Sequence, residues 1–257
     1  MKDKKVLYKK IAESVGYPVV SVCLVVLIWQ IAAQKIGVEM VLPTPKRAAS
    51  EFFRVLGTRG FYVALGSSLW RSVVCFALSA MIAAILALLS AAFSPVYRVL
   101  SPIVSVLRAL PTMAVILLFF IWTSARQTPS FVAALVTFPL LFSGFYGALT
   151  GVDEELLEMM RVYRVPFSRK ALVYAKETLA PALKLLKSAV GLNLKVLIAA
   201  EVMVSTKNSL GNLMMLAKVE LDTSALFAYT VAAVLLSAAL EGLFALLERL
   251  LVRWKRG

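Results

Sequence analysis

The chain has no histidine and only two cysteines, Cys23 and Cys75, and these scarcities exclude several kinds of chemistry. Both cysteines lie inside apolar segments, so the sequence supports neither a zinc site nor a disulfide framework. The phosphate-binding pattern G-x-x-x-x-G-K-(S/T) does not occur, and no carboxylates cluster within an apolar segment. We therefore expect no catalytic residue, no metal site and no cofactor in this chain.

Charge is scarce as well. Charged residues make up 16% of the 257 residues, whereas 61% are hydrophobic, which is more than a soluble domain needs to fill its core. Charge-free runs at 14–34, 72–97 and 127–152 each have about the 20 residues that cross a bilayer. The net charge of +14 does not indicate nucleic acid as a partner, because lysine and arginine stand between the apolar runs rather than among aromatics on a solvated face.

Hydropathy and the placement of proline predict an all-α membrane protein with about six transmembrane helices. We expect the spans near 16–34, 68–93, 99–123, 130–150, 183–204 and 225–248, the third being interrupted by Arg108 and Pro111. Residues 1–15 are expected to form a basic tail and 16–257 a single transmembrane domain. The tail has the charge order of a secretory signal, but the following run exceeds the usual core of about 7 to 15 residues, which favours an uncleaved span.

The distribution of lysine and arginine predicts the orientation. With the N-terminus taken as cytoplasmic, 17 of these residues fall on that side, 8 on the other and 3 within spans, which accounts for all 28. Cytoplasmic segments of membrane proteins carry the excess of positive charge. Both termini and the segment 151–182 are thus predicted to lie on the cytoplasmic side of a cytoplasmic (inner) membrane.

The segment 151–182 is polar but has helical periodicity. Apolar residues recur at helical spacing in two sets separated by Pro166, namely Leu156, Leu157, Met160 and Tyr163, then Phe167, Ala171 and Tyr174. We predict two short amphipathic helices joined at the proline. A short helix with an apolar stripe is suited to binding in a groove of a partner protein.

Several short stretches in a fixed order carry a resemblance to a known family. They are Val41-Leu42-Pro43-Thr44-Pro45, Ser68-Leu69-Trp70-Arg71, Leu107-Arg108-Ala109-Leu110-Pro111, Lys187, Gly191, Ala199-Ala200-Glu201 and Ser209-Leu210-Gly211. Together they resemble permease subunits of binding-protein-dependent ABC importers, in the branch associated with nitrate, sulfonate, taurine and related small solutes. The resemblance extends from about residue 41 to residue 254.

The cytoplasmic signature of that family is only partly kept. Glu158 and Pro181 match it, whereas Met159 and Met160 replace two alanines, Arg164 stands where glycine is expected and Glu177 replaces the first proline. Because a left-handed backbone costs more for arginine than for glycine, we expect the turn to use Pro166 instead.

The resemblance implies a set of partners. It implies a permease homodimer in the lipid membrane, two ABC ATPase subunits that bind ATP and Mg²⁺, and an extracytoplasmic solute-binding protein. ATP hydrolysis would then occur in the separate ATPase, so this chain is expected not to be an enzyme. The resemblance assigns ATPase docking to Glu158, Met159, Met160, Arg161 and Arg164, with the two methionines buried against the ATPase.

Charges within the spans are expected to be structural or functional, because an ionised side chain costs about 2.5 to 3.5 kcal/mol at mid-membrane. Arg71 and Glu201 lie near span ends and are expected to extend to an interface. For Lys195 two interpretations remain open: an ion pair with Glu241, or a cation lining the solute path. In the second case Arg108 would be another path residue and the solute an anion.

Three functions are consistent with these features to different degrees. The first is the permease of an ATP-driven importer for a small solute, with a small anion such as a sulfonate or nitrate as the best candidate. The second is an ion-coupled secondary transporter that needs no ATPase. The third, a membrane-embedded enzyme, has almost no suitable side chains.

Overall fold

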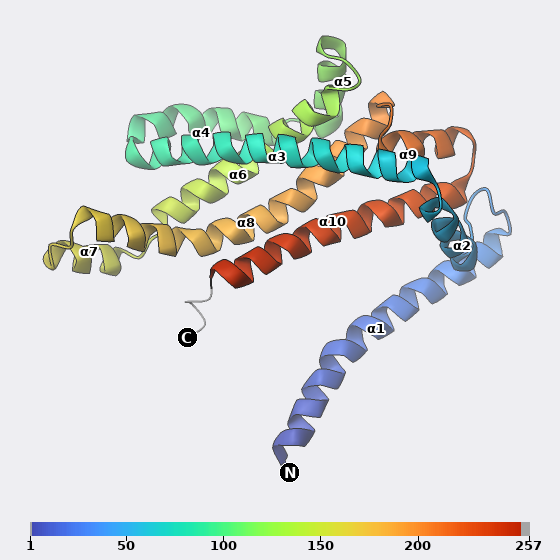
Figure 1. Cartoon of the computed structure of the whole chain (residues 1–257), viewed down its shortest axis with the longest axis horizontal. Helices are drawn as coiled ribbons and strands as arrows, with labels where there is room; N and C mark the ends of the chain where they lie inside the picture. The colour runs from blue at the N-terminus through green and yellow to red at the C-terminus, as the bar shows by residue number, and fades with distance from the viewer. Residues whose placement is uncertain (1, 253–257) are drawn as a thin grey trace. The chain divides into compact units, whose positions relative to one another are not determined.

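The computed structural model describes residues 2–252, and within them the regular elements are all helices. Ten helices follow one another: α1 (Lys2–Ile36), α2 (Pro45–Leu56), α3 (Arg59–Ala92), α4 (Ser94–Ala109), α5 (Thr112–Trp122), α6 (Thr128–Thr150), α7 (Glu154–Val162), α8 (Phe167–Val204), α9 (Leu210–Val219) and α10 (Thr223–Leu251) (Figure 1). The predicted all-α membrane class is confirmed.

Four of the described helices are long and apolar enough to cross a membrane. They are the Val19–Ile36 part of α1, α3, α6 and α10, and the bent pair of α4 and α5 raises the number to as many as five. The remaining predicted span, 183–204, lies in the second half of α8. Lys187, Lys195 and Glu201 make that half less apolar than the other spans.

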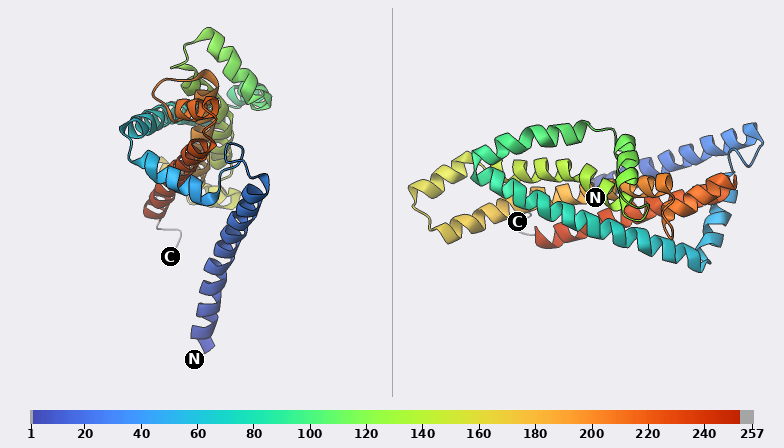
Figure 2. Two further views of the ribbon diagram at one scale, coloured as in Figure 1. Left: turned by 90° about the vertical axis from the view of Figure 1, so that its right-hand side faces the viewer. Right: turned by 90° about the horizontal axis from the view of Figure 1, so that it is seen from above.

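The predicted third span is broken into two helices. α4 and α5 meet at an angle of 98° across Leu110 and Pro111, and α5 turns away from α4 in both views of Figure 2. Proline lacks a backbone N–H and restricts the residue before it to extended conformations, and Leu110 has φ −66° and ψ 129°. The proline therefore ends one helix and begins the next.

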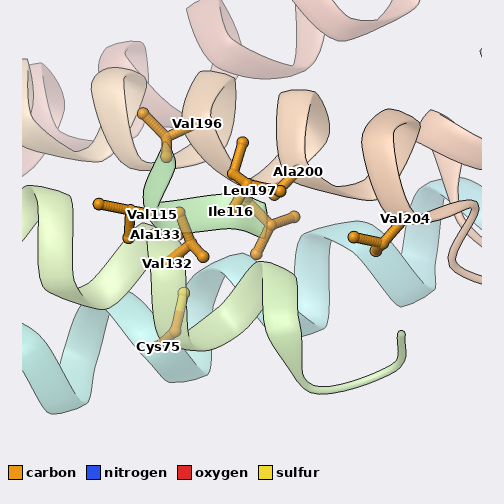
Figure 3. Packing of buried hydrophobic residues seen from close by; sticks show 9 residues of the cluster. All are labelled: Cys75, Val115, Ile116, Val132, Ala133, Val196, Leu197, Ala200 and Val204. Carbon is orange, nitrogen blue, oxygen red and sulfur yellow. The ribbon is translucent and has the colours of Figure 1, made fainter. Parts of the chain in front are cut away.

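One compact unit comprises residues 59–215 together with the chain from residue 232 onward. In it α3 packs along α6, and α6 packs along α8. Nine buried residues of α3, α5, α6 and α8 form one apolar cluster: Cys75, Val115, Ile116, Val132, Ala133, Val196, Leu197, Ala200 and Val204 (Figure 3). Fully buried Ala83, Ala133 and Ala189 let helix backbones approach closely, as is usual between membrane helices.

The other unit comprises residues up to 58 and residues 216–231. Within it the indole N–H of Trp29 donates to the Pro43 carbonyl at 3.0 Å, and its ring stacks on Phe227 with centroids 5.1 Å apart. Thr44 caps α2 by accepting from the Arg47 N–H, and Pro45 occupies the first helical position. These contacts fix the turn around the proline-rich stretch 41–45.

Candidate functional site: a buried ion pair, a cavity and an exposed helix

A buried ion pair joins α3 to α8. Glu201 is 0% exposed, and its Oε1 accepts from Arg71 Nη2 at 2.9 Å and from Nε at 3.1 Å. Its Oε2 accepts from the Ser68 hydroxyl at 2.7 Å. The prediction that Arg71 and Glu201 extend to a membrane interface is therefore wrong, because each is the other's partner inside the protein.

The same carboxylate lies at the beginning of α9. The backbone N–H of Gly211 donates to Glu201 Oε2 at 3.3 Å, and the N–H of Leu210 donates to Ser68 Oγ at 2.9 Å. The first N–H groups of a helix have no partners within it and attract negative charge. Glu201 and Ser68 thus satisfy the start of α9 and attach it to α3 and α8.

Gly211 makes this arrangement possible by its size. A Cβ at position 211 would lie 2.4 Å from Glu201 Cβ and 2.6 Å from the backbone nitrogen of Val202. Both distances are far below van der Waals contact. The glycine in the Ser209-Leu210-Gly211 stretch is thus required by close packing of α9 on the end of α8.

A second buried polar centre was not predicted. Asn193 of α8 is 0% exposed, donates to the Ser72 carbonyl and hydroxyl at 3.1 and 3.0 Å, and accepts from the Thr137 hydroxyl at 3.3 Å. It therefore links α3, α6 and α8 through one amide. The signal available in the sequence was a single amide in an otherwise apolar stretch, where such side chains usually bond across helices.

A cavity of about 810 Å³ lies beside the ion pair, lined by α3, α5, α6 and the turn between the last two. Its polar lining includes two cations, Arg71 and Arg126, and no acidic side chain is among its described lining residues. Its walls are mostly apolar, with Phe119 and Phe131 stacked 6.0 Å apart. The sequence did not single out Arg126.

Arg108 lies between two smaller cavities, of about 260 and 200 Å³. Its guanidinium donates to the Ser143 hydroxyl at 2.6 Å and to the Pro139 carbonyl at 3.5 Å. Through the second of these bonds Arg108 links the end of α4 to the proline within α6. Its place in a solute path remains a prediction.

Lys195 and Glu241 are not brought together as an ion pair in the described part of the chain. Lys195 is exposed on α8, whereas the Glu241 carboxylate accepts from Ser237 at 3.3 Å and occupies the space left open by Gly191. The second half of α8 does form an ion pair through Glu201, whose partner is Arg71 of α3. The structure thus does not show the ion pair with Glu241, and the place of Lys195 in a solute path remains a prediction.

The segment 151–182 contains one short helix, and not two. α7 contains most of the first predicted apolar set, and Asp153 accepts from the Glu155 N–H at 2.9 Å as its N-cap. The residues after Pro166 do not form a short second helix, because they begin the 38-residue helix α8, which continues through Pro181. α7 therefore lies beside the start of α8 (Figure 1), whereas Glu201 lies near the end of that helix.

α7 exposes a different apolar stripe from the predicted one. Met160 is only 3% exposed, whereas Met159, Val162 and Tyr163 are 49%, 72% and 76% exposed. These three residues are spaced i, i+3 and i+4, so they share one face of the helix. Of the two methionines, Met159 is exposed and Met160 is buried within the chain, and the charged residues Glu158, Arg161 and Arg164 are exposed beside Met159.

Arg164 adopts the left-handed conformation that the sequence analysis expected it to avoid. Its φ is 48°, its N–H donates to Arg161 O, and the Val165 N–H donates to Met160 O at 3.1 Å. This pair of bonds is the Schellman arrangement that ends many helices, with the left-handed residue usually a glycine. The expectation was wrong because two satisfied helix carbonyls offset the strain on one arginine.

We expect Arg164→Gly to stabilise this turn. The left-handed backbone conformation costs a non-glycine residue roughly 1 to 2 kcal/mol, and glycine removes this strain. Glycine also makes the unfolded chain more flexible, which offsets part of the gain, so we expect a net stabilisation of about 0.5 to 1 kcal/mol. Hydrogen exchange of the amides of α7 measures it. Arg161→Gly, inside the helix, is the control and should accelerate exchange.

Comparison with known proteins gives matches over most of the chain. Residues 79–254 match the family model described as binding-protein-dependent transport system inner membrane component. The chain is 26% identical over 239 residues to the putative aliphatic sulfonates transport permease protein SsuC of Bacillus subtilis, covering 90% of this chain and 84% of the relative. The protein of the same name from Escherichia coli is 27% identical, with 90% and 88% covered. The riboflavin transport system permease protein RibX of Chloroflexus aurantiacus is 29% identical, with 94% and 91% covered.

Proposed function

Because the chain belongs to the family of binding-protein-dependent transport system inner membrane components, we propose that it is the translocation subunit of an ATP-driven importer for a small anion. The family places it in a multi-pass inner-membrane ABC transporter. The proposal adds that a separate ATPase binds ATP and Mg²⁺, that a solute-binding protein delivers the solute from outside, and that the permease works as a homodimer with both termini cytoplasmic.

The observation that carries the ATP-driven part is the exposed face of α7. Met159, Val162 and Tyr163 form an apolar stripe on a helix held at both ends by its own caps. Contiguous exposed apolar side chains mark interaction sites, and a short amphipathic helix fits a groove of a partner protein. The rigid connection of α7 to α8 through the turn at Arg164 would transmit movement of the partner to the membrane helices.

The choice of an anion rests on cations inside the membrane unit. Arg71 and Arg126 line the large cavity, and Arg108 lies between the two smaller ones. Arg71 and Arg108 lie within predicted spans, where cations are costly and mark solute pathways when they face a cavity, and Arg126 lies in the turn between α5 and α6. The names of the relatives include sulfonates as well as riboflavin. A sulfonate fits the cations here better than an uncharged solute would.

The double substitution Met159→Asp and Val162→Asp should separate the permease from its ATPase. Carboxylates in the core of a helix-in-groove contact cost more than the 1.4 kcal/mol that corresponds to tenfold weaker binding. The tagged permease is purified in its native complex, and the ATPase recovered with it is measured by quantitative mass spectrometry. We expect at least tenfold less ATPase than with the unchanged permease.

The double substitution Val38→Asp and Val41→Asp is the matched control, because it places the same two charges at exposed apolar residues far from α7 in the sequence. It should leave ATPase recovery unchanged. If the α7 double variant also left it unchanged, or if the purified chain alone moved solute into liposomes under an ion gradient without ATP, the importer proposal would give way to the secondary transporter.

A further inference from the structure

We propose that the 810 Å³ cavity is a binding site for an organic monoanion with an apolar tail, and that buried Glu201 sets this charge preference by neutralising Arg71. The inference rests on the proposed function and makes its solute class specific. It also assigns Arg126 as the cation that selects the anion.

The charge of the cavity follows from its lining. Two guanidinium groups, those of Arg71 and Arg126, face it, and Glu201 is paired with the first of them but does not line the cavity. Among the residues that the structure describes, none compensates the charge of Arg126, so one positive charge of the lining remains unpaired. A ligand with one negative charge restores neutrality, whereas a dianion would bring an unpaired charge into an apolar site at considerable cost.

Arg71 has donors left for such a ligand. Glu201 occupies its Nε–H and one N–H of Nη2, and a guanidinium has five donors in all. The Nη1 amino group has no hydrogen-bond partner among the described residues, so it is available to a planar or tetrahedral oxyanion. Glu201 fixes the guanidinium in place before the ligand arrives, which lowers the entropic cost of binding.

The position of Arg126 is fixed by its backbone. It lies in the turn between α5 and α6, where the Thr206 hydroxyl donates to the Ala125 carbonyl at 2.6 Å and the Thr128 hydroxyl donates to the Ser124 carbonyl at 2.9 Å. Its side chain is exposed, and no described residue forms an ion pair with it. The free cation is thus carried by a rigid turn at the cavity wall.

The rest of the lining suits an apolar tail. Leu78, Ile82, Phe131, Leu135 and Phe138 all face the cavity. Burying one CH₂ group contributes enough to tighten binding about fourfold, so alkyl chains should add affinity stepwise. Nitrate offers no such surface and should bind poorly, which separates it from sulfonates within the proposed class of anions.

The test uses the purified full-length permease in nanodiscs of phosphatidylcholine and a series of n-alkanesulfonates from methane to hexane. We expect thermal stabilisation whose midpoint concentration falls about fourfold for each added CH₂, with no response to nitrate or to hexyltrimethylammonium, which has the same tail and the opposite charge. Arg126→Gln should weaken hexanesulfonate binding at least tenfold. Arg98→Gln, an exposed arginine outside the cavity, should not.

Glu201→Gln tests the charge rule separately. It removes the internal counter-charge but keeps the side-chain shape, so the site should gain affinity for 1,2-ethanedisulfonate relative to ethanesulfonate by at least tenfold. Because Arg126 is exposed, its variant should fold normally, and its result decides the proposal even where the Glu201 variant is poorly folded.

Three results would overturn the inference. The first is equal stabilisation by nitrate and hexanesulfonate, and the second is unchanged hexanesulfonate binding in Arg126→Gln. The third is stabilisation by phosphatidylglycerol that depends on Arg126 and that hexanesulfonate cannot replace. This third result would assign the site to a lipid headgroup. None of these readouts involves the ATPase. A result that contradicts the proposal for the cavity is therefore distinguishable from one that contradicts the importer proposal, which depends on ATPase recovery.

Discussion

Replacing Arg71 with methionine should lower the free energy of unfolding by about 3 to 5 kcal/mol, the typical cost of removing one partner of a buried ion pair. Glu201 is 0% exposed and would retain its hydrogen bond from Ser68, but its charge would have no counter-charge. The measurement is reversible unfolding in mixed micelles, followed by circular dichroism as the denaturing detergent is increased.

Two matched variants determine whether the effect belongs to the pair. Glu39→Gln removes an ion pair with Arg47 at 3.8 Å in which both side chains are 61% exposed, and it should change stability by no more than about 0.5 kcal/mol. The double variant Arg71→Met, Glu201→Leu should recover much of the loss, because an apolar pair avoids desolvating charges. An Arg71→Met cost no larger than that of Glu39→Gln would contradict a structural role for the pair.

Gly211→Ala should cost about 3 kcal/mol, at the upper end of what overpacking usually costs. The added Cβ would lie 2.6 Å from the Val202 backbone nitrogen and 2.8 Å from the Glu201 carbonyl carbon, so main chain would have to move. That movement would also break the Gly211 N–H contact with Glu201. The same unfolding assay measures the loss, together with the yield of folded protein.

Gly191→Ala provides the control because its added Cβ would meet a side chain and not the main chain. There the new Cβ would lie 2.0 Å from Glu241 Oε1, the far end of a side chain that can rotate away. We expect a loss well below that of Gly211→Ala. If both alanines cost the same, contact with main chain would not be what makes Gly211 necessary.

The helix set and the family were accessible from the sequence because both depend on local information. Long apolar runs predict membrane helices from composition alone, and Pro111 gives a local signal for a break, although Pro139 and Pro181 lie within helices that continue. The resemblance to importer permeases, carried by short stretches from Pro43 to Gly211, is confirmed by the family match. A polar segment with helical periodicity was likewise enough to place α7.

Details of the 151–182 segment were less accessible. Periodicity identified an amphipathic helix but could not decide that Met160 faces inward while Met159 and Val162 face out, because apolar residues lie on both sides of α7. The conformation of Arg164 was missed for a related reason. Residue preference favours glycine there, but the backbone bonds to Arg161 and Met160 that hold it depend on the whole turn.

The sequence by itself determined the all-helical membrane class, the family and the presence of charges within the spans. Only the tertiary structure decided which charges meet: Arg71 and Glu201 are 130 residues apart in the chain, yet 2.9 Å apart in space. Hydropathy is a property of neighbouring residues, whereas an ion pair depends on the packing of α3 against α8. The packing of α3 against α5 and α6 likewise places Arg126 beside a cavity, and our proposal for the site depends on that position.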